Sequence, residues 1–236
     1  MTNEEQNKYW LDFHRFQMRQ EIIYTPKINK VLKAQVQKYI ETKDTIYIRS
    51  SELYGLLKEL HTNVGVAWAW KTRSQMKKDG GQMGFSERIV SFMRRYFYGG
   101  LLNDAENITQ TTIRTIQEVL SEAALTGWSF DEIVKRLVSP DFTAIRAKLI
   151  ARTETVAAAN GGSMANATAT GLPLNKIWIA ARDSRTRLHH KEINQTVVAK
   201  EAKFIVGGMP MDYPGDKAGG AAECCNCRCT VAFIPI

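Results

Sequence analysis

Apolar residues recur at three- and four-residue spacing through most of the first 170 residues of the chain. Side chains at that spacing share one face of an α-helix, so the pattern predicts amphipathic helices rather than strands. Capping residues, glycine pairs and prolines divide the pattern into segments. We expect helices over about 2–24, 25–40, 51–78, 86–98, 103–126, 129–138 and 140–169.

The pattern changes at Gly171, Leu172 and Pro173. Beyond them, short β-type runs and one short helix are separated by glycine, proline and charged residues. The expected strands cover 176–180, 196–199 and 230–234, and the expected helix covers 185–193. The sequence therefore predicts an α+β protein, with a mainly helical N-terminal region over 1–171 and a small α+β domain over 172–236. Because a domain of about 65 residues has little stability of its own, we expect it to pack on the preceding helix.

The composition is that of a globular protein, with 44% apolar and 24% charged residues among 236. It excludes disordered and fibrous chains. No stretch approaches the roughly 18 apolar residues of a membrane span. The first ten residues are polar and acidic, unlike a secretory signal, so we expect a protein that is made and kept in a cytosol, with no membrane partner. The net charge of +8 suggests an anionic partner, either nucleic acid or an acidic protein surface.

All four cysteines lie within six residues near the C-terminus, which excludes a disulfide framework. Cys227 and Cys229 point to one face of a predicted strand, and with His190 they could supply three zinc ligands. The favoured alternative is that both are buried thiols on the inner face of a closing strand, with no cofactor. Cys224 and Cys225 are expected to be exposed loop thiols.

A dense charged cluster lies between Asp183 and His190. Arg185 and Arg187 would share a face in extended chain, and such a cluster can bind phosphate or a carboxylate. We favour a structural role, in which Asp183 caps the short helix and holds one arginine in an ion pair. Two further charged residues lie on the long helix before the small domain. These residues, Arg152 and Glu154, are expected to reach Asp183 and Arg187 and form a charged clasp between the two parts.

A basic stretch between residues 71 and 98 carries seven cations against two acidic residues, a net charge of +5, and tryptophan and tyrosine flank it. Basic residues mixed with aromatic ones can line a nucleic-acid path. The alternative is a solvated basic face over a packed apolar stripe. The candidate contacts are Lys71, Arg73, Lys77, Lys78, Arg88, Arg94 and Arg95.

Several short motifs follow one another in the last third of the chain. They are ARTET at 151–155, Asn160, Lys176-Ile-Trp178, the charged cluster at 183–190 and the terminal Asn226-Cys-Arg-Cys229. In order and spacing, over about 150–236, they resemble the phage Mu F-like head morphogenesis family of minor head proteins. The residues that match the family's motifs are Arg152, Glu154, Asp183, Arg185, Arg187, His190, Cys227 and Cys229.

The resemblance implies a virion component present in few copies inside the capsid, associated with the portal vertex. Its partners would be the phage portal protein, capsid or scaffold proteins and, non-specifically, the packaged DNA. Its role would lie in head assembly or in DNA packaging and delivery. Where relatives commonly carry Asp-Gly or Asn-Gly, this chain has Asn194-Gln195. Since glutamine lacks the freedom of glycine at positive φ, we expect the turn after His190 to differ.

Two other classes of function remain open at this point. One is a nuclease- or transferase-like enzyme that uses Glu154, Arg187 and His190. A convincing acid–base pair is missing, so we favour a protein that is not an enzyme. The other is a zinc-stabilised binding module.

Overall fold

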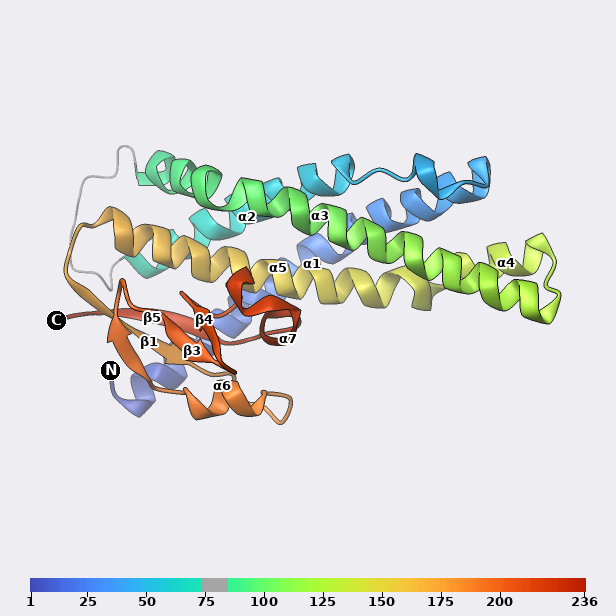
Figure 1. Cartoon of the computed structure of the whole chain (residues 1–236). Helices are drawn as coiled ribbons and strands as arrows, with labels where there is room; N and C mark the ends of the chain where they lie inside the picture. Colours follow the sequence, from blue (N-terminus) through green and yellow to red (C-terminus); the bar gives the residue numbers. More distant parts are fainter. Residues whose placement is uncertain (74–84) are drawn as a thin grey trace.

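The computed structural model describes residues 1–73 and 85–236. Long helices lie side by side, and a small sheet packs against one end of them, close to both ends of the chain (Figure 1). The helical elements before the sheet are α1 Asn3–Thr42, η1 Thr45–Tyr47, α2 Ser51–Thr72, α3 Phe85–Thr126, α4 Phe130–Leu137 and α5 Pro140–Ala169. The later elements are β1 Leu174–Ile179, α6 Leu188–Glu192, β2 Val197–Ala199, β3 Phe204–Val206, β4 Met209–Met211, η3 Lys217–Gly219, α7 Gly220–Cys224 and β5 Thr230–Pro235.

Two of the expected helix breaks are wrong. The helix α1 continues through Pro26, and α3 continues through Gly99 and Gly100. A proline inside a helix costs about 3 kcal/mol and a glycine about 1 kcal/mol. Packing next to each site offsets that cost, since Tyr24 and Ile28 flank Pro26 in the core. Tyr98 and the buried Leu101 flank the glycine pair in a second apolar cluster. The helix α2 ends at Thr72 with Arg73 as its C-cap, and residues 74–78 of the expected helix lie outside the described residues.

The sheet is antiparallel, with β1 between β2 and β5, and β3 and β4 form a separate hairpin. The three expected strands match β2, β1 and β5 with shifts of a few residues, whereas the hairpin was not expected. The structure is therefore mainly helical with a small C-terminal sheet region, which confirms the α+β class. None of the helices in the described residues is long and apolar enough to span a membrane.

One core joins the helices to the sheet. Its buried side chains include Trp68 of α2 and Trp178 of β1. The start of α1 is tied to the last strand, because the Tyr9 hydroxyl donates to the carbonyl of Val231 at 3.0 Å. The indole of Trp10 donates to the carbonyl of Arg228 at 3.3 Å. Residues from the two ends of the chain thus share one packed unit.

The turn between α6 and β2 keeps the backbone that glycine favours, although glutamine occupies it. Gln195 has φ 68°, in the left-handed region. Its backbone N–H donates to the carbonyl of Trp178 at 2.8 Å, and the side chain of Asn194 accepts from the N–H of Ala180 at 2.9 Å. Gln195 thus adopts the left-handed backbone without being glycine, and these hydrogen bonds to β1 hold the turn despite the strain.

Gly162 marks the closest approach of α5 to α2. A Cβ built on Gly162 would overlap the carbonyl oxygen of Gly65 and lie 2.7 Å from its Cα. We expect Gly162→Ala to destabilise the protein by about 1 to 3 kcal/mol, because the two helices must separate. Urea unfolding measures this change.

The matched control is Gly99→Ala in α3, where an added Cβ meets nothing within 4 Å. There the higher helix propensity of alanine should stabilise the protein by up to about 1 kcal/mol. Effects of the same sign at both glycines would mean that helix propensity, not the contact between α2 and α5, decides the result at Gly162.

Candidate functional site

The motif residues gather where α5 meets the segment that leads into β5. Asn160 of α5 is fully buried there, and its side-chain amide donates to the carbonyls of Pro214 at 2.8 Å and Cys229 at 3.1 Å. Its carbonyl oxygen accepts from the Thr230 hydroxyl at 2.9 Å and from the N–H of Val231 at 3.2 Å. One side chain thus fixes the start of the last strand on α5.

Arg152, two turns earlier on α5, joins three parts of the chain. Its guanidinium donates to both carboxylate oxygens of Glu21 in α1, each at 2.9 Å, and to the side-chain oxygen of Asn226 at 2.7 Å. The hydroxyl of Thr153 accepts from the N–H of Asn226 at 2.8 Å. Arg152 therefore links α1 and α5 to the loop before β5.

Glu154 lies at the buried end of an ionic cluster formed by α2, α3, α5 and η3. It is 3% exposed and contacts the His61 imidazole at 2.9 Å and the Lys217 ammonium at 2.6 Å. Lys217 also lies 3.3 Å from a carboxylate oxygen of Asp104. Burial alone would raise the pKa of Glu154, but Lys217 and His61 outweigh it and lower that pKa to about 2.

The expected clasp between Arg152 or Glu154 and the pair Asp183 and Arg187 is wrong. Arg152 and Glu154 are satisfied by Glu21, Asn226, His61 and Lys217. Sequence reasoning missed these four partners. The sequence did contain an indication for Glu21. Its carboxylate lies on the same face of α1 as the buried Tyr24 and Ile28, and a carboxylate on a buried face needs a partner.

Asp183 forms its ion pair with Arg228 and not with Arg187 as expected. Its carboxylate accepts from Arg228 Nε at 2.9 Å and Nη2 at 2.8 Å, and the Arg228 hydrogen bonds lower its pKa. It accepts from the N–H of Arg185 at 2.9 Å, which closes the turn before α6 rather than capping α6. The Arg187 guanidinium donates to the carbonyl of Cys225 at 2.6 Å. The cluster therefore holds the loop before β5 to the loop before α6.

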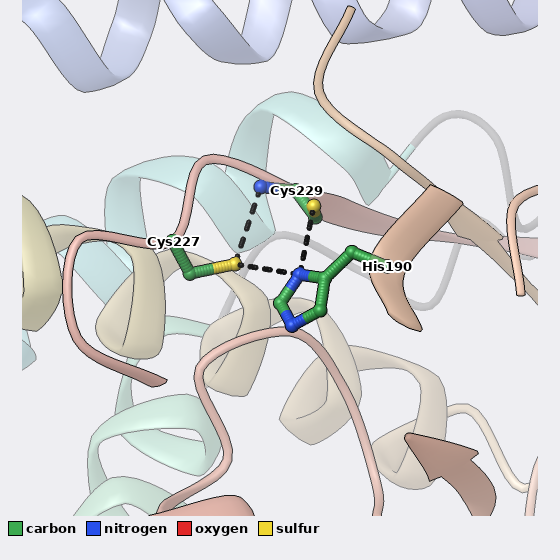
Figure 2. Close-up of side chains that lie close together, drawn as sticks. All are labelled: His190, Cys227 and Cys229. Atoms are coloured by element: carbon green, nitrogen blue, oxygen red, sulfur yellow. Dashed lines mark hydrogen bonds between the residues drawn. The ribbon is translucent and has the colours of Figure 1, made fainter. Parts of the chain in front are cut away.

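His190, Cys227 and Cys229 converge in the interior (Figure 2). The imidazole Nδ1 lies 3.3 Å from Cys229 Sγ and 3.7 Å from Cys227 Sγ. On the other side of the ring, Nε2 lies 2.9 Å from a carboxylate oxygen of Glu223. Burial opposes protonation of His190, but Cys227 and Glu223 outweigh it and raise its pKa. Among the described residues, His190, Cys227 and Cys229 form a group whose arrangement suits a metal ion.

The other two cysteines differ from each other. Cys225 is exposed as expected, whereas the expectation for Cys224 is wrong. Cys224 is buried in α7, and its thiol donates to the carbonyl of Asp216 at 2.7 Å. Burial raises the pKa of this thiol to about 12.

An open cavity of about 470 Å³ lies between α3, α5 and α7. Its wall combines the apolar side chains of Ile108, Leu149 and Ile150 with the charged groups of Asp104, Glu154 and Lys217. The two carboxylates face an ammonium that already neutralises part of their charge. The cavity therefore offers a mixed apolar and polar surface next to the Glu154 cluster.

The basic residues proposed as nucleic-acid contacts lie at the end of α2 and in the first half of α3. Lys71, Arg88, Arg94 and Arg95 are exposed, and Arg73 is half-buried with its guanidinium 5.3 Å from the Trp70 ring centre. Lys77 and Lys78 lie outside the described residues. The exposed cations remain a predicted nucleic-acid surface.

The lowered pKa of Glu154 predicts that the free energy of unfolding depends on pH in acid. Because the folded pKa of about 2 lies below the ordinary 4.5, ionised Glu154 stabilises the fold above about pH 4.5. That contribution is lost as the pH falls towards 2. We expect the free energy of unfolding to fall less steeply with acidification in Glu154→Gln than in the wild type, as measured by urea unfolding between pH 5 and about 2.5.

The control is Glu106→Gln, which removes an exposed carboxyl from α3. Its slope against pH should match that of the wild type. Equal slopes in all three proteins would show that the Glu154 cluster does not keep its carboxyl ionised in acid.

Comparison with known proteins identifies the family. The model of the family described as Phage Mu protein F like protein matches residues 114–232, beginning within α3 and earlier than the motifs alone indicate. The minor head protein GP7 of Bacillus phage SPP1 is 28% identical over 131 residues, which are 52% of this chain and 41% of that protein.

A second relative is the NAD(+)--arginine ADP-ribosyltransferase EFV of Enterococcus faecalis. It is 30% identical over 133 residues, which are 55% of this chain and 26% of that protein. The chain thus spans less than half the length of these curated relatives. No solved structure matches the chain. Because the family model covers half of the sequence and includes all the motif residues from Arg152 to Cys229, the chain belongs to the phage Mu protein F-like family of head morphogenesis proteins.

Proposed function

We propose that this protein is a phage minor head protein, present in few copies inside the capsid at the portal vertex. The observation that carries the proposal is the family match over 114–232, which contains α5, β1 and the first half of β5. The similarity to a protein named as a minor head protein supports the same role. In this role it acts in head assembly or in DNA packaging and delivery, with portal and capsid or scaffold proteins as partners.

An exposed apolar stripe on α1 supports docking on another head protein. Leu11, Met18 and Ile22 are exposed, and their spacing of seven and four residues places them on one face of the helix. Exposed apolar residues gathered on one face are typical of protein interaction sites. The stripe is therefore the proposed contact with the portal or capsid.

The docking proposal is tested by complementing a phage that lacks the gene. Wild-type protein should be found in purified heads by mass spectrometry, with immunogold label at a single vertex. Ile22→Glu should lower incorporation at least tenfold without loss of helical circular dichroism. The control Leu125→Glu changes an exposed leucine of α3 and should be incorporated normally. Equal incorporation of both variants contradicts docking through α1, and a wild-type protein absent from heads contradicts the function itself.

The exposed cations at the end of α2 and in the first half of α3 support contact with packaged DNA. Trp70 is 46% exposed beside Lys71 and Arg73, which gives an aromatic surface among positive charges. Such a surface binds phosphates without reading sequence. We propose weak, sequence-independent DNA binding whose affinity falls steeply as the salt concentration rises.

Fluorescence anisotropy with duplexes of unrelated sequence, at several salt concentrations, tests DNA binding. Reversing Arg94 and Arg95 to glutamate should weaken binding several-fold and flatten its salt dependence. The control reverses Lys135 and Arg136, an exposed adjacent pair on α4 at the far end of the helices (Figure 1). Equal losses from the two double variants contradict the surface at α2 and α3, and sequence-selective binding contradicts the proposed mode.

The enzyme alternative gains support from the ADP-ribosyltransferase relative, although the aligned part is about a quarter of that protein. The proposed catalytic residues are Glu154, Arg187 and His190. Glu154 is held by His61 and Lys217, and His190, which is 1% exposed, is held by Glu223. Since Glu154 and His190 already hold partners within the protein, they are poorly placed to act on a substrate, and we expect no transfer of ADP-ribose from NAD(+) to arginine and no nuclease activity. Either activity, lost in Glu154→Gln, would favour the enzyme.

A further inference from the structure

Three soft or borderline metal ligands meet at one buried point that the proposed head function does not use. His190 comes from α6, and Cys227 and Cys229 come from the segment that leads into β5 (Figure 2). The imidazole Nδ1 and the two Sγ atoms all lie within 4.8 Å of one another. All three side chains are buried.

The spacing fits the edges of a tetrahedral zinc site. With Zn–S of about 2.3 Å and Zn–N of about 2.0 to 2.1 Å, a nitrogen and a sulfur bound to one zinc ion lie about 3.6 Å apart. The two nitrogen–sulfur distances, 3.3 Å to Cys229 and 3.7 Å to Cys227, bracket that value. A metal ion would therefore fit among the three atoms with small movements.

A carboxylate holds the imidazole as metal-bound histidines are usually held. Glu223 Oε2 lies 2.9 Å from Nε2, the ring nitrogen that faces away from the thiols. A proton on Nε2 leaves Nδ1 with a free lone pair directed at the two sulfurs. The ring of Trp178 packs edge-on against the imidazole, with centroids 5.4 Å apart, and further fixes its orientation.

Each sulfur also accepts a backbone hydrogen bond. The N–H of Ala181 donates to Cys229 Sγ at 3.3 Å, and the N–H of Cys229 donates to Cys227 Sγ at 3.4 Å. Such donors stabilise a thiolate, the form that binds a metal, once a metal ion displaces the thiol proton.

We propose that His190, Cys227 and Cys229 bind one Zn²⁺ ion, with Glu223 as the positioning residue for His190. Two thiolates and one imidazole are a donor set that zinc prefers, and water completes the coordination in sites with three protein ligands. The ion would join α6 to the start of β5, which are 37 residues apart at their nearest ligands. This site is independent of portal docking and of DNA binding.

The metal content of the full chain, purified without chelators, tests the site. Mass spectrometry of the metals should find about one zinc per chain. Cys227→Ser and Cys229→Ser should each lower bound zinc at least tenfold, whereas Cys225→Ser, which alters an exposed neighbouring thiol, should keep it. Zinc below about a tenth of an equivalent in the wild type, zinc lost equally in Cys225→Ser, or one equivalent of copper instead would overturn the proposal.

Two further measurements keep the test decisive if a cysteine variant fails to fold. Cobalt added to the wild-type protein after zinc removal should give thiolate-to-cobalt charge-transfer absorption, and its absence would contradict thiolate ligation. Competition with a chromophoric chelator should show zinc bound 10- to 100-fold more weakly by Glu223→Gln. The control Glu201→Gln changes an exposed carboxylate and should bind as the wild type does. Unchanged affinity in Glu223→Gln would remove Glu223 from the proposed site.

Discussion

Replacing Asn160 with alanine is expected to lower the free energy of unfolding by about 3 to 5 kcal/mol. The substitution removes an amide that makes four hydrogen bonds at a position where water has no access. Buried donors and acceptors left without partners cost about 1 to 3 kcal/mol each, and partial relaxation reduces their sum. Urea unfolding followed by circular dichroism measures the loss.

Thr230→Val is the matched control for Asn160→Ala. It keeps nearly the same side-chain volume, leaves the amide of Asn160 in place and removes the hydrogen bond from the Thr230 hydroxyl to the Asn160 side-chain oxygen. The expected loss is about 1 kcal/mol. If Asn160→Ala costs no more than Thr230→Val, the amide is not what fastens β5 to α5.

The helices were predictable because each carries a local signal. Thr2 with Glu5 and Ser129 with Glu132 form the capping boxes that their spacing indicates, and they open α1 and α4. The breaks were harder to predict, since the cost of Pro26 or of Gly99 is local whereas the packing that outweighs it comes from other helices. The small hairpin of β3 and β4 has strands of only three residues, too short to show a period.

The motif residues of the site were predictable from the sequence, but the residues that pair with them were not. Asp183 and Arg187 stand four residues apart, which suggests a pair if the segment is helical. The segment is a turn, and Arg228, 45 residues further on, takes the carboxylate instead. Sequence spacing reports neighbours along one element, whereas this ion pair depends on how β5 returns beside β1.

The meeting of His190 with Cys227 and Cys229 could be foreseen, because few residues of these types exist in the chain. The role of Glu223 could not. It lies on α7, a helix of five residues that follows a glycine pair and gives no periodic signal. Glu223 contacts His190 because the tertiary fold brings α7 next to α6.

Arg228→Ala is expected to destabilise the protein by about 3 kcal/mol. Arg228 is 4% exposed, and its guanidinium binds both carboxylate oxygens of Asp183. Removing one partner of a buried ion pair costs about 3 to 5 kcal/mol, and the 27% exposure of Asp183 places the expected loss at the lower end. The loss should lower the melting temperature and speed proteolysis between α5 and β1, near residues 171–173.

Arg187→Ala separates this structural role from a functional one. Arg187 makes a single hydrogen bond to the carbonyl of Cys225 at a partly exposed position, so its removal should cost only about 1 kcal/mol. A larger loss of stability for Arg187→Ala than for Arg228→Ala would contradict the observed pairing of Asp183. If instead Arg187→Ala melts like the wild type and still abolishes phage production, Arg187 contacts a partner or a substrate rather than holding the fold, because the stability that the variant keeps leaves function as the only property it has lost.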